Sequence, residues 1–194
     1  MLGVRRFSQW GLWFGGTLVL LAAVLIGIDV LMRKFVARSI GGADELAGYA
    51  LAIGTAWGLG ATLLDRAHIR IDSLYVLLPQ KLRLMLDAVA IVLLIGFFAL
   101  TTWHGLEVVS QSWTSGSRSQ SALETPTIIP QVLWIAGLAA FVVVGLLLLV
   151  QALKTALSGD LRGAANLIST RSAEEEVKDE IRDLKDRQVH EGKN

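Results

Sequence analysis

Four long apolar runs constrain this chain more than any other feature of its sequence. Residues 7–28, 46–64 and 125–153 contain no charged side chain, and residues 88–106 are interrupted only by the titratable His104. A helix that crosses a hydrocarbon core of about 30 Å needs roughly 20 apolar residues, because each residue adds about 1.5 Å. Each run is long enough, so the sequence predicts an integral membrane protein with four spans.

The runs predict helices rather than barrel strands. Backbone amides in lipid must be satisfied within the spanning structure, and the apolar residues do not alternate with polar ones as barrel strands require. We therefore predict an all-α integral membrane protein with a four-helix transmembrane domain over residues 1–157. The expected spans are about 8–32, 45–64, 82–107 and 130–153, with a short interfacial helix before the third. The charged residues 158–194 are expected to form a flexible cytoplasmic tail.

The first run also has features of a secretory signal, because Arg5 and Arg6 precede it. Its apolar stretch exceeds the roughly 7–15 residues of a signal core, and no convincing small-residue cleavage site follows. We expect an uncleaved first helix.

The composition excludes several classes of function. Lys and Arg total 18 against 17 Asp and Glu, so the net charge is +1 and nucleic-acid binding has no electrostatic basis. The absence of cysteine excludes disulfides, iron–sulfur clusters and thiol catalysis. We expect no cofactor, no metal and no enzymatic activity. A haem enzyme needs facing axial histidines, whereas His68 and His104 are predicted at opposite membrane faces.

Basic residues predict the orientation. With four spans, both termini and the second loop share one side, which holds 14 of the basic residues against 4 on the other. The positive-inside rule then places both termini in the cytoplasm. Against this orientation, the outer side would carry a cluster of three basic residues, Arg33, Lys34 and Arg38.

The second run is rich in small residues and predicts close helix contacts. Gly54 and Gly58 form a small-xxx-small pair, which lets another backbone approach closely. Packing inside this chain and packing on a second subunit remain open at this point. Trp57 lies deep in the run, where its indole N–H needs a protein partner. The candidate subunit-interface residues are Ala50, Gly54, Trp57, Gly58, Gly60 and Ala61.

Most charged groups lie at the ends of the runs. Asp29 and Arg33 have the i, i+4 spacing of an ion pair, which we favour over an ion-transport role. We predict that the charged end residues anchor or assemble the protein, the alternative for Arg66 and Arg70 being contact with lipid phosphates alone. The candidates are Arg33, Glu45, Arg66, His68, Arg70 and Asp72. No mid-membrane carboxylate pair is present, so a stand-alone carrier or channel is disfavoured.

Two further expectations concern the last third of the chain. Residues 141–150 are bulky nearly all round, apart from Gly145, and predict a helix that faces lipid along much of its surface. Residues 110–130 carry six serines with only Arg118 and Glu124 as charges, which predicts a polar outer loop.

The order of these features resembles the small membrane subunit of tripartite ATP-independent periplasmic (TRAP) transporters, the DctQ-type protein. The matching residues are Asp29 to Phe35 at the end of the first run, Asp44 to Ala47 at the start of the second, Gly60, the run His68-Ile69-Arg70-Ile71-Asp72, Pro79, Leu123 and Pro126. The resemblance covers about residues 7 to 153. The chain departs from the family pattern after Pro126, where Thr127 to Pro130 intervene, and in the tail after Gly159.

The resemblance implies a role that the residues alone do not give. A protein of this family assists a large DctM-type permease subunit in the bacterial inner membrane, which a periplasmic DctP-type solute-binding protein supplies. The implied activity is sodium-driven uptake of an organic anion, such as a dicarboxylate or sugar acid. The solute and ion sites would lie on the large subunit, so this chain is expected to be a scaffold that contacts its partners and membrane lipid.

Overall fold

The chain is all-helical in the computed structural model, which describes residues 2–65, 79–160, 163, 167–168 and 181. Its four helices are α1 (Leu2–Val36), α2 (Ala43–Leu64), α4 (Gln80–Ser115) and α5 (Ile128–Leu157). All four are long and apolar enough to cross a membrane. The predicted fold class, an all-α membrane protein, is confirmed.

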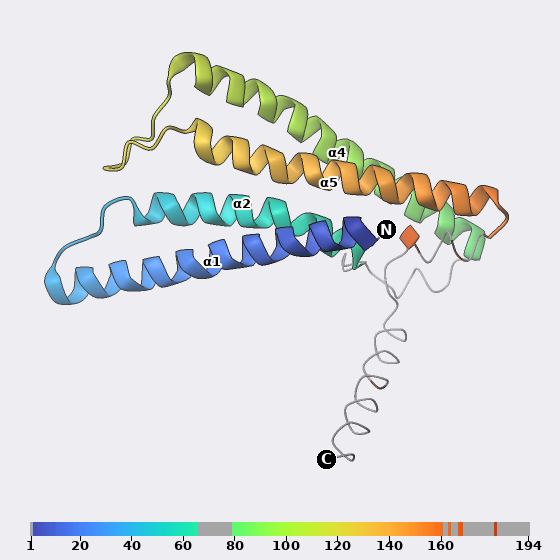
Figure 1. The fold of residues 1–194 in the computed structure, drawn as a ribbon, viewed down its shortest axis with the longest axis horizontal. Coiled ribbons are helices and arrows are strands. Elements are labelled where there is room, and N and C mark those ends of the chain that lie inside the picture. The colour runs from blue at the N-terminus through green and yellow to red at the C-terminus, as the bar shows by residue number, and fades with distance from the viewer. Residues whose placement is uncertain (1, 66–78, 161–162, 164–166, 169–180, 182–194) are drawn as a thin grey trace.

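The helices form an open row rather than a closed bundle (Figure 1). Helix α1 packs on α2, α2 packs on α5, and α5 packs on α4. The row is therefore α1–α2–α5–α4, with α1 and α4 at its two edges. The α1–α2 turn and the α4–α5 loop lie at the same end of the row, which we call the outer end in keeping with the predicted topology.

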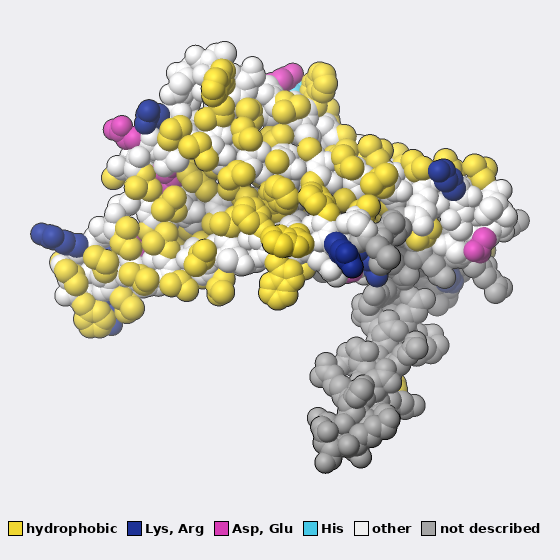
Figure 2. Space-filling model, in the orientation of Figure 1, with side chains coloured by type: hydrophobic (Ala, Val, Ile, Leu, Met, Phe, Trp, Pro, Cys, Tyr) yellow, Lys and Arg dark blue, Asp and Glu magenta, His cyan; other side chains and the backbone are white. Residues whose placement is uncertain are grey.

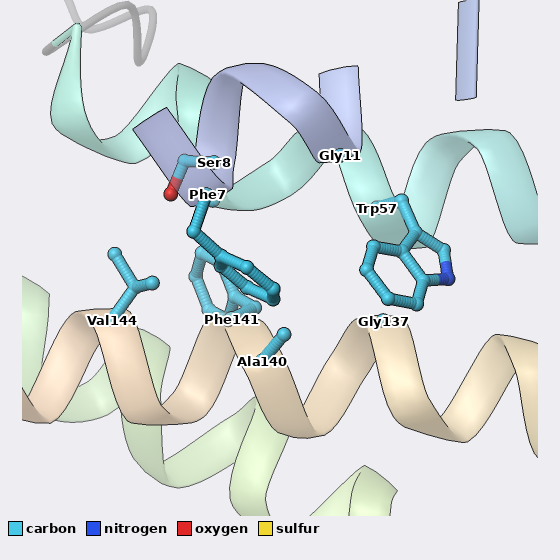
Figure 3. Close-up of a pocket in the computed structure, with 9 residues that line it drawn as sticks. Phe7, Ser8, Gly11, Trp57, Gly137, Ala140, Phe141 and Val144 are labelled. Atoms are coloured by element: carbon cyan, nitrogen blue, oxygen red, sulfur yellow. The ribbon is translucent and has the colours of Figure 1, made fainter. Parts of the chain in front are cut away.

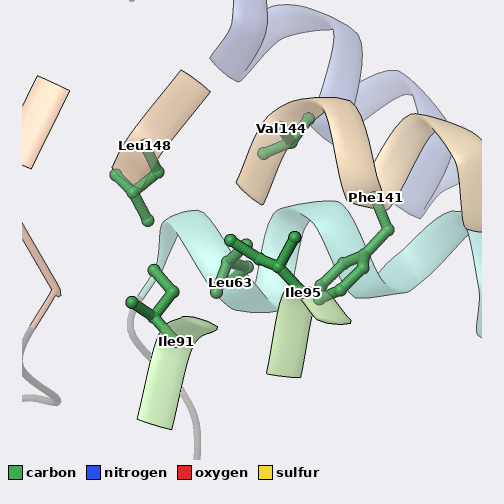
Figure 4. Packing of buried hydrophobic residues seen from close by; sticks show 6 residues of the cluster. All are labelled: Leu63, Ile91, Ile95, Phe141, Val144 and Leu148. Atoms are coloured by element: carbon green, nitrogen blue, oxygen red, sulfur yellow. The ribbon is translucent and has the colours of Figure 1, made fainter. Parts of the chain in front are cut away.

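Helix α5 carries the core because it has a neighbour on each side. Phe141, Val144 and Leu148 of α5 are buried against Leu63 of α2 and against Ile91 and Ile95 of α4 (Figure 4). The expectation that residues 141–150 face lipid along much of their surface is therefore wrong at Phe141, Val144, Gly145 and Leu148, which are buried, while the other six residues are exposed or half-buried. A helix inside a row must bury two of its faces, and composition alone does not distinguish a buried branched side chain from a lipid-facing one.

The helices extend beyond the expected spans, most clearly at the outer end of α4. Ser110, Ser112 and Ser115 belong to α4, so the serine-rich loop begins at Gly116 and not at residue 110. Gly116 ends the helix with φ of 61°, a left-handed conformation that glycine adopts at little cost. The predicted interfacial helix and most of the predicted tail lie outside the described residues.

Candidate functional site: packing and assembly surfaces

The contact between α1 and α2 is made by glycine backbones. A Cβ atom built on Gly15 would lie 2.5 Å from the carbonyl oxygen of Gly54, and one on Gly54 would lie 2.8 Å from that of Gly15. A Cβ on Gly11 would lie 2.9 Å from the Trp57 carbonyl oxygen. Real Cβ atoms do not approach backbone so closely, so only glycine fits at these three positions. It joins α1 and α2 into a tight hairpin.

Trp57 connects this hairpin to α5. Its indole Nε1–H donates to the carbonyl oxygen of Leu133 at 3.0 Å. Phe7 and Phe14 of α1 pack against the same ring, with centroid distances of 6.2 Å and 5.6 Å. A Cβ on Gly137 would lie 2.9 Å from the Trp57 ring, so a glycine there makes room for the indole. The predicted protein contact of Trp57 is confirmed, and it lies within the chain.

A small cavity lies beside Trp57, where α1, α2 and α5 meet (Figure 3). Phe141 and Val144 of α5 contribute apolar walls, and the Ser8 hydroxyl of α1 lies at its edge. Ser8 is 4% exposed, and its Oγ makes no hydrogen bond to the described residues. The lining is otherwise apolar, so the cavity offers no set of groups for catalysis.

The α1–α2 turn is organised around Asp29, which is 1% exposed. Its Oδ1 accepts hydrogen bonds from the Ser39 hydroxyl at 2.9 Å and from the Ile40 backbone N–H at 2.7 Å. Its Oδ2 pairs with Arg33 at 2.5 Å, and Arg33 also lies 3.5 Å from Asp44. The ion pair expected from the spacing is present. Its additional backbone bond shows that Asp29 shapes the turn.

The α4–α5 loop is fastened to the start of α2 by Glu45. The Ser121 hydroxyl donates to Glu45 Oε2, while Ser121 Oγ accepts from the Leu123 backbone N–H at 3.1 Å. Ser119 Oγ accepts from the Thr125 backbone N–H at 3.0 Å and lies 3.3 Å from Ser121 Oγ. Loop amides therefore use the acceptor positions of the two serines, which leaves hydroxyl protons to turn toward the carboxylate.

Gly42 completes the contact between the loop and the turn. Its φ is 82°, and a Cβ there would lie 2.5 Å from Cδ1 of Leu123. Both the backbone conformation and the close approach require glycine. Together with Glu45, this contact holds the α4–α5 loop over the α1–α2 turn.

The predicted assembly residues other than Arg33, Glu45 and Trp57, whose contacts are given above, fall into three groups. Gly54, Gly60 and Ala61 are buried within the chain, so internal packing accounts for them. Ala50 and Gly58 are half-buried, and a Cβ on Gly58 would meet only Leu12, at 3.8 Å. Contact of the proposed interface residues with a second subunit stays a prediction. Arg66, His68, Arg70 and Asp72 lie outside the described residues.

Sequence reasoning missed several residues that build these contacts. Gly11 and Gly15 form a small-xxx-small pair in the first run, which is the same signal that was recognised at Gly54 and Gly58. The serine-rich composition predicts only a polar loop for Ser119 and Ser121. Their spacing from Glu45 along the chain gives no sign that the carboxylate and the hydroxyls meet.

The part of the chain that the structure describes offers no apparent catalytic centre. It contains no group of three or more His, Cys, Asp or Glu side chains that could hold a metal ion. The polar groups described above stabilise a turn and a loop.

The comparisons with known proteins agree with this geometry. Residues 22–155 match the family model described as tripartite ATP-independent periplasmic transporters, DctQ component. No curated protein and no solved structure matches the chain. The match covers more than half of the sequence and includes all of α2 and α4, most of α5 and the outer end of α1, which identifies the class as a multi-pass membrane component of a transporter. The chain belongs to the DctQ family and is the small membrane subunit of a TRAP transporter.

Proposed function

We propose that this subunit scaffolds a large DctM-type permease during sodium-driven uptake of an organic anion, such as a dicarboxylate or sugar acid. A periplasmic DctP-type protein delivers the solute. The family match carries this proposal, because the DctQ component belongs to a three-part transporter.

The open row of helices supports a scaffold role. Edge helix α1 packs on α2, and edge helix α4 packs on α5, which leaves broad apolar faces on both edges. A closed carrier would instead surround a polar site near the middle of the membrane. Within the described helices, the buried polar side chains are Ser8, Asp29, Asp87 and Ser112. All four lie toward helix ends, and none is paired with another in a central site.

The charged residues at the span ends fit anchoring and assembly. Arg33 and Glu45 hold the outer turn and loop, as their contacts show. We extend the same kind of role to Arg66, His68, Arg70 and Asp72 from their position in the sequence, with contact to the large subunit and to lipid phosphates. The solute and ion sites then belong to the large subunit.

We place the protein in the bacterial inner membrane with both termini in the cytoplasm, on the basis of the basic-residue bias. A reporter fused after Asn194 is expected to be active only in its cytoplasmic form. A periplasmic signal there overturns the orientation without affecting the family assignment.

Reconstitution tests the scaffold role directly. The wild-type chain, its large subunit and the binding protein are purified together, and sodium-dependent uptake is measured per assembled complex. Arg70→Ala and Asp72→Ala are expected to lower uptake in step with the loss of complex, and Arg70→Lys is expected to be milder because it keeps the charge without the forked donors. A large change in apparent solute affinity with the complex intact contradicts the scaffold role. Uptake by this chain alone favours an independent carrier.

The subunit interface needs a variant that leaves the hairpin intact. Gly54→Leu is unsuitable because Gly54 is in backbone contact with Gly15 inside the chain. Gly58→Leu is the cleaner test, because a Cβ there meets only the Leu12 side chain of α1, at an ordinary van der Waals distance of 3.8 Å. Loss of copurification in a normally folded Gly58→Leu protein supports the interface, and unchanged copurification removes Gly58 from it.

A further inference from the structure

Close contacts between neighbouring helices define a reference plane across the row, and the position of any residue along its helix axis can be measured from this plane. Three contacts between neighbouring helices define it, namely Gly15 with Gly54, Gly137 with Ala56, and Gly105 with Ile135. Each is a close approach between residues of adjacent helices, so the four glycines lie near one plane across the row. We call Gly15, Gly54, Gly137 and Gly105 the glycine layer.

Toward the outer end, the first charged side chain lies nearer to the glycine layer on edge helix α4 than on α1 or α2, whereas α5 has no charged residue between the layer and its first residue, Ile128. At about 1.5 Å per residue, the first charged side chain lies about 21 Å away on α1 (Asp29), about 14 Å on α2 (Glu45) and about 3 Å on α4 (Glu107). Glu107 is 64% exposed and pairs with His104, which is 62% exposed, at 3.0 Å. These charges stand on the surface of α4 and not inside the row.

Toward the inner end, the order is reversed. By the same count, the first charge lies about 14 Å from the layer on α1 (Arg6), about 16 Å on α2 (Asp65), about 26 Å on α5 (Lys154) and about 27 Å on α4 (Asp87). We call the stretch of each helix between its first outer and its first inner charged residue the uncharged zone. Both limits of this zone therefore shift in the same direction from edge helix α1 to edge helix α4. Figure 2 shows this slant at the outer end, where the charged side chains of the α1–α2 hairpin lie farther out than the magenta and cyan ones at the α4 edge.

The thickness of the uncharged zone decides how the bilayer crosses the row. With the helices upright, the zone shared by all of them is only about 17 Å thick, far below the roughly 30 Å of a hydrocarbon core. From α1 to α4, the inner limit of the uncharged zone shifts by about 13 Å and the outer limit by about 18 Å. These shifts occur over three helix spacings of about 9 Å each, so a bilayer that follows them is tilted by about 30° relative to the row. Helices α1, α2 and α4 then have about 30 to 35 Å of uncharged length, equivalent to about 26 to 30 Å along the tilted normal, and α5 has about 39 Å, from Ile128 to Leu153.

Two of the four exposed tryptophans in the described helices support the tilt. Trp10 on α1 is 78% exposed and Trp103 on α4 is 65% exposed. They lie about 8 Å and about 3 Å to the inner side of the glycine layer, so an upright row puts both indoles in the lipid interior. In the tilted row, Trp10 lies near the inner boundary and Trp103 near the outer one, where tryptophan is enriched. Trp13 and Trp113 are 77% and 73% exposed, and they lie about 3 Å inward and about 12 Å outward of the layer, away from the boundaries of the tilted row.

We infer that the bilayer crosses this helix row obliquely, at about 30° to the helix axes, so that the lipid-contacting belt runs from the outer half of α1 to the inner half of α4. The surface of this belt contacts the acyl chains of the lipid bilayer. The inference does not depend on the proposed transport role.

Two residue pairs test the tilt, because the members of each pair are at the same level in the fold. Leu20 and Ser110 both lie about 8 Å outward of the glycine layer, and Gly3 and Leu93 both lie about 18 Å inward. All four positions are exposed, and the chain has no native cysteine. Single cysteine variants of the full chain are reconstituted in phosphatidylethanolamine–phosphatidylglycerol vesicles, and the cysteines are labelled with a charged maleimide or, separately, with a nitroxide.

The tilted row predicts opposite behaviour within each pair. Ser110→Cys and Gly3→Cys are expected to react with the charged maleimide at least about tenfold faster than Leu20→Cys and Leu93→Cys, because lipid excludes the reagent and disfavours the thiolate. Nitroxides at Leu20 and Leu93 are expected to collide with oxygen more than with a polar nickel chelate, and those at Ser110 and Gly3 to show the reverse. Equal rates and equal depths within each pair overturn the tilt. Variants are compared only when they elute from gel filtration as the wild-type protein does. The variants Leu20→Ser and Leu93→Ser measure the effect of removing each leucine side chain without a thiol.

Discussion

The row has two kinds of junction, and they differ in what they tolerate. Between α1 and α2, glycine backbones touch, and Gly15 and Gly54 leave no space for even a methyl group. Between α5 and α4, branched and aromatic side chains interdigitate, with Phe98 and Phe141 in edge contact at a centroid distance of 4.6 Å. The first junction is therefore sensitive to added atoms along its backbone contact. The second is sensitive to removed atoms, and to added atoms only where side chains fill the space above Gly105 and Gly145.

The membrane gives this difference its physical basis. Lipid tails are as apolar as leucine, so burying a leucine between helices yields little of the stabilisation it yields in water. Close backbone approach increases dispersion contact along the whole α1–α2 interface, and a filled junction between α5 and α4 avoids a void. Each junction reaches tight packing by a different route.

The largest effect is expected from Gly15→Leu. The new Cβ would lie 2.5 Å from a backbone oxygen that cannot move aside, so α1 must separate from α2. We expect a loss of about 3 kcal/mol or more, the upper range of overpacking costs, measured as a fall in the unfolding temperature of the detergent-purified protein. The matched control is Gly16→Leu, one residue away, where nothing lies within 4 Å. Equal stability of the two variants would show that the glycine junction is not essential.

A smaller effect is expected when atoms are removed from the other junction. Phe141 is 1% exposed, and Phe141→Ala leaves a cavity between α5 and α4. Because the transfer contribution is small in lipid, the cavity accounts for most of the expected loss of about 2 kcal/mol. Val143→Ala, on an exposed position of the same helix, is the control and should lose well under half as much. A loss at Val143 equal to that at Phe141 would contradict the assigned orientation of α5.

Glu45→Gln tests the attachment of the outer loop to the hairpin. The amide lacks the charge that strengthens the serine hydrogen bond and places an NH₂ donor beside hydroxyl donors, so we expect local opening of the loop that costs about 1 to 2 kcal/mol. Faster amide hydrogen exchange at residues 117–127, with α5 unchanged, is the measurement. Asp44→Asn is the control, since the Asp44 side chain is 81% exposed. If both variants exchange alike, Glu45 does not fasten the loop.

The sequence predicted where the helices lie in the chain better than it predicted which helices pack on one another. The uncharged runs located all four helices, because the cost of unsatisfied backbone in lipid leaves few alternatives. The small residues of α2 correctly indicated close packing, but they do not specify which helix approaches. The partner of Gly54 proved to be Gly15, and a pair search extended to the first run would have suggested it.

The polar contacts were predictable only where they are local. Asp29 and Arg33 are four residues apart, so their ion pair follows from helix geometry. Glu45 and Ser121 are 76 residues apart, and their contact depends on how the two outer turns meet. Likewise, the lipid-facing residues of 141–150 could not be separated from the buried ones until α5 was placed between two helices.

The smallest effect is expected at the point where the two junctions connect, in Trp57→Phe. This change keeps an aromatic ring between Phe7 and Phe14 and removes the indole N–H that donates to the Leu133 carbonyl oxygen at 3.0 Å. A neutral hydrogen bond contributes about 0.5 to 1.5 kcal/mol, and the measured values for polar contacts between membrane helices lie at the lower end, so we expect a loss of about 0.6 kcal/mol. Trp10→Phe is the matched control, because Trp10 is 78% exposed and lacks this contact. Unfolding temperatures in the same detergent compare the stability of the two variants. A larger loss of stability in Trp10→Phe would contradict the role of the Trp57 hydrogen bond as the link between the hairpin and α5. A loss above about 2 kcal/mol in Trp57→Phe would mean that the indole stabilises the row more strongly than one hydrogen bond can.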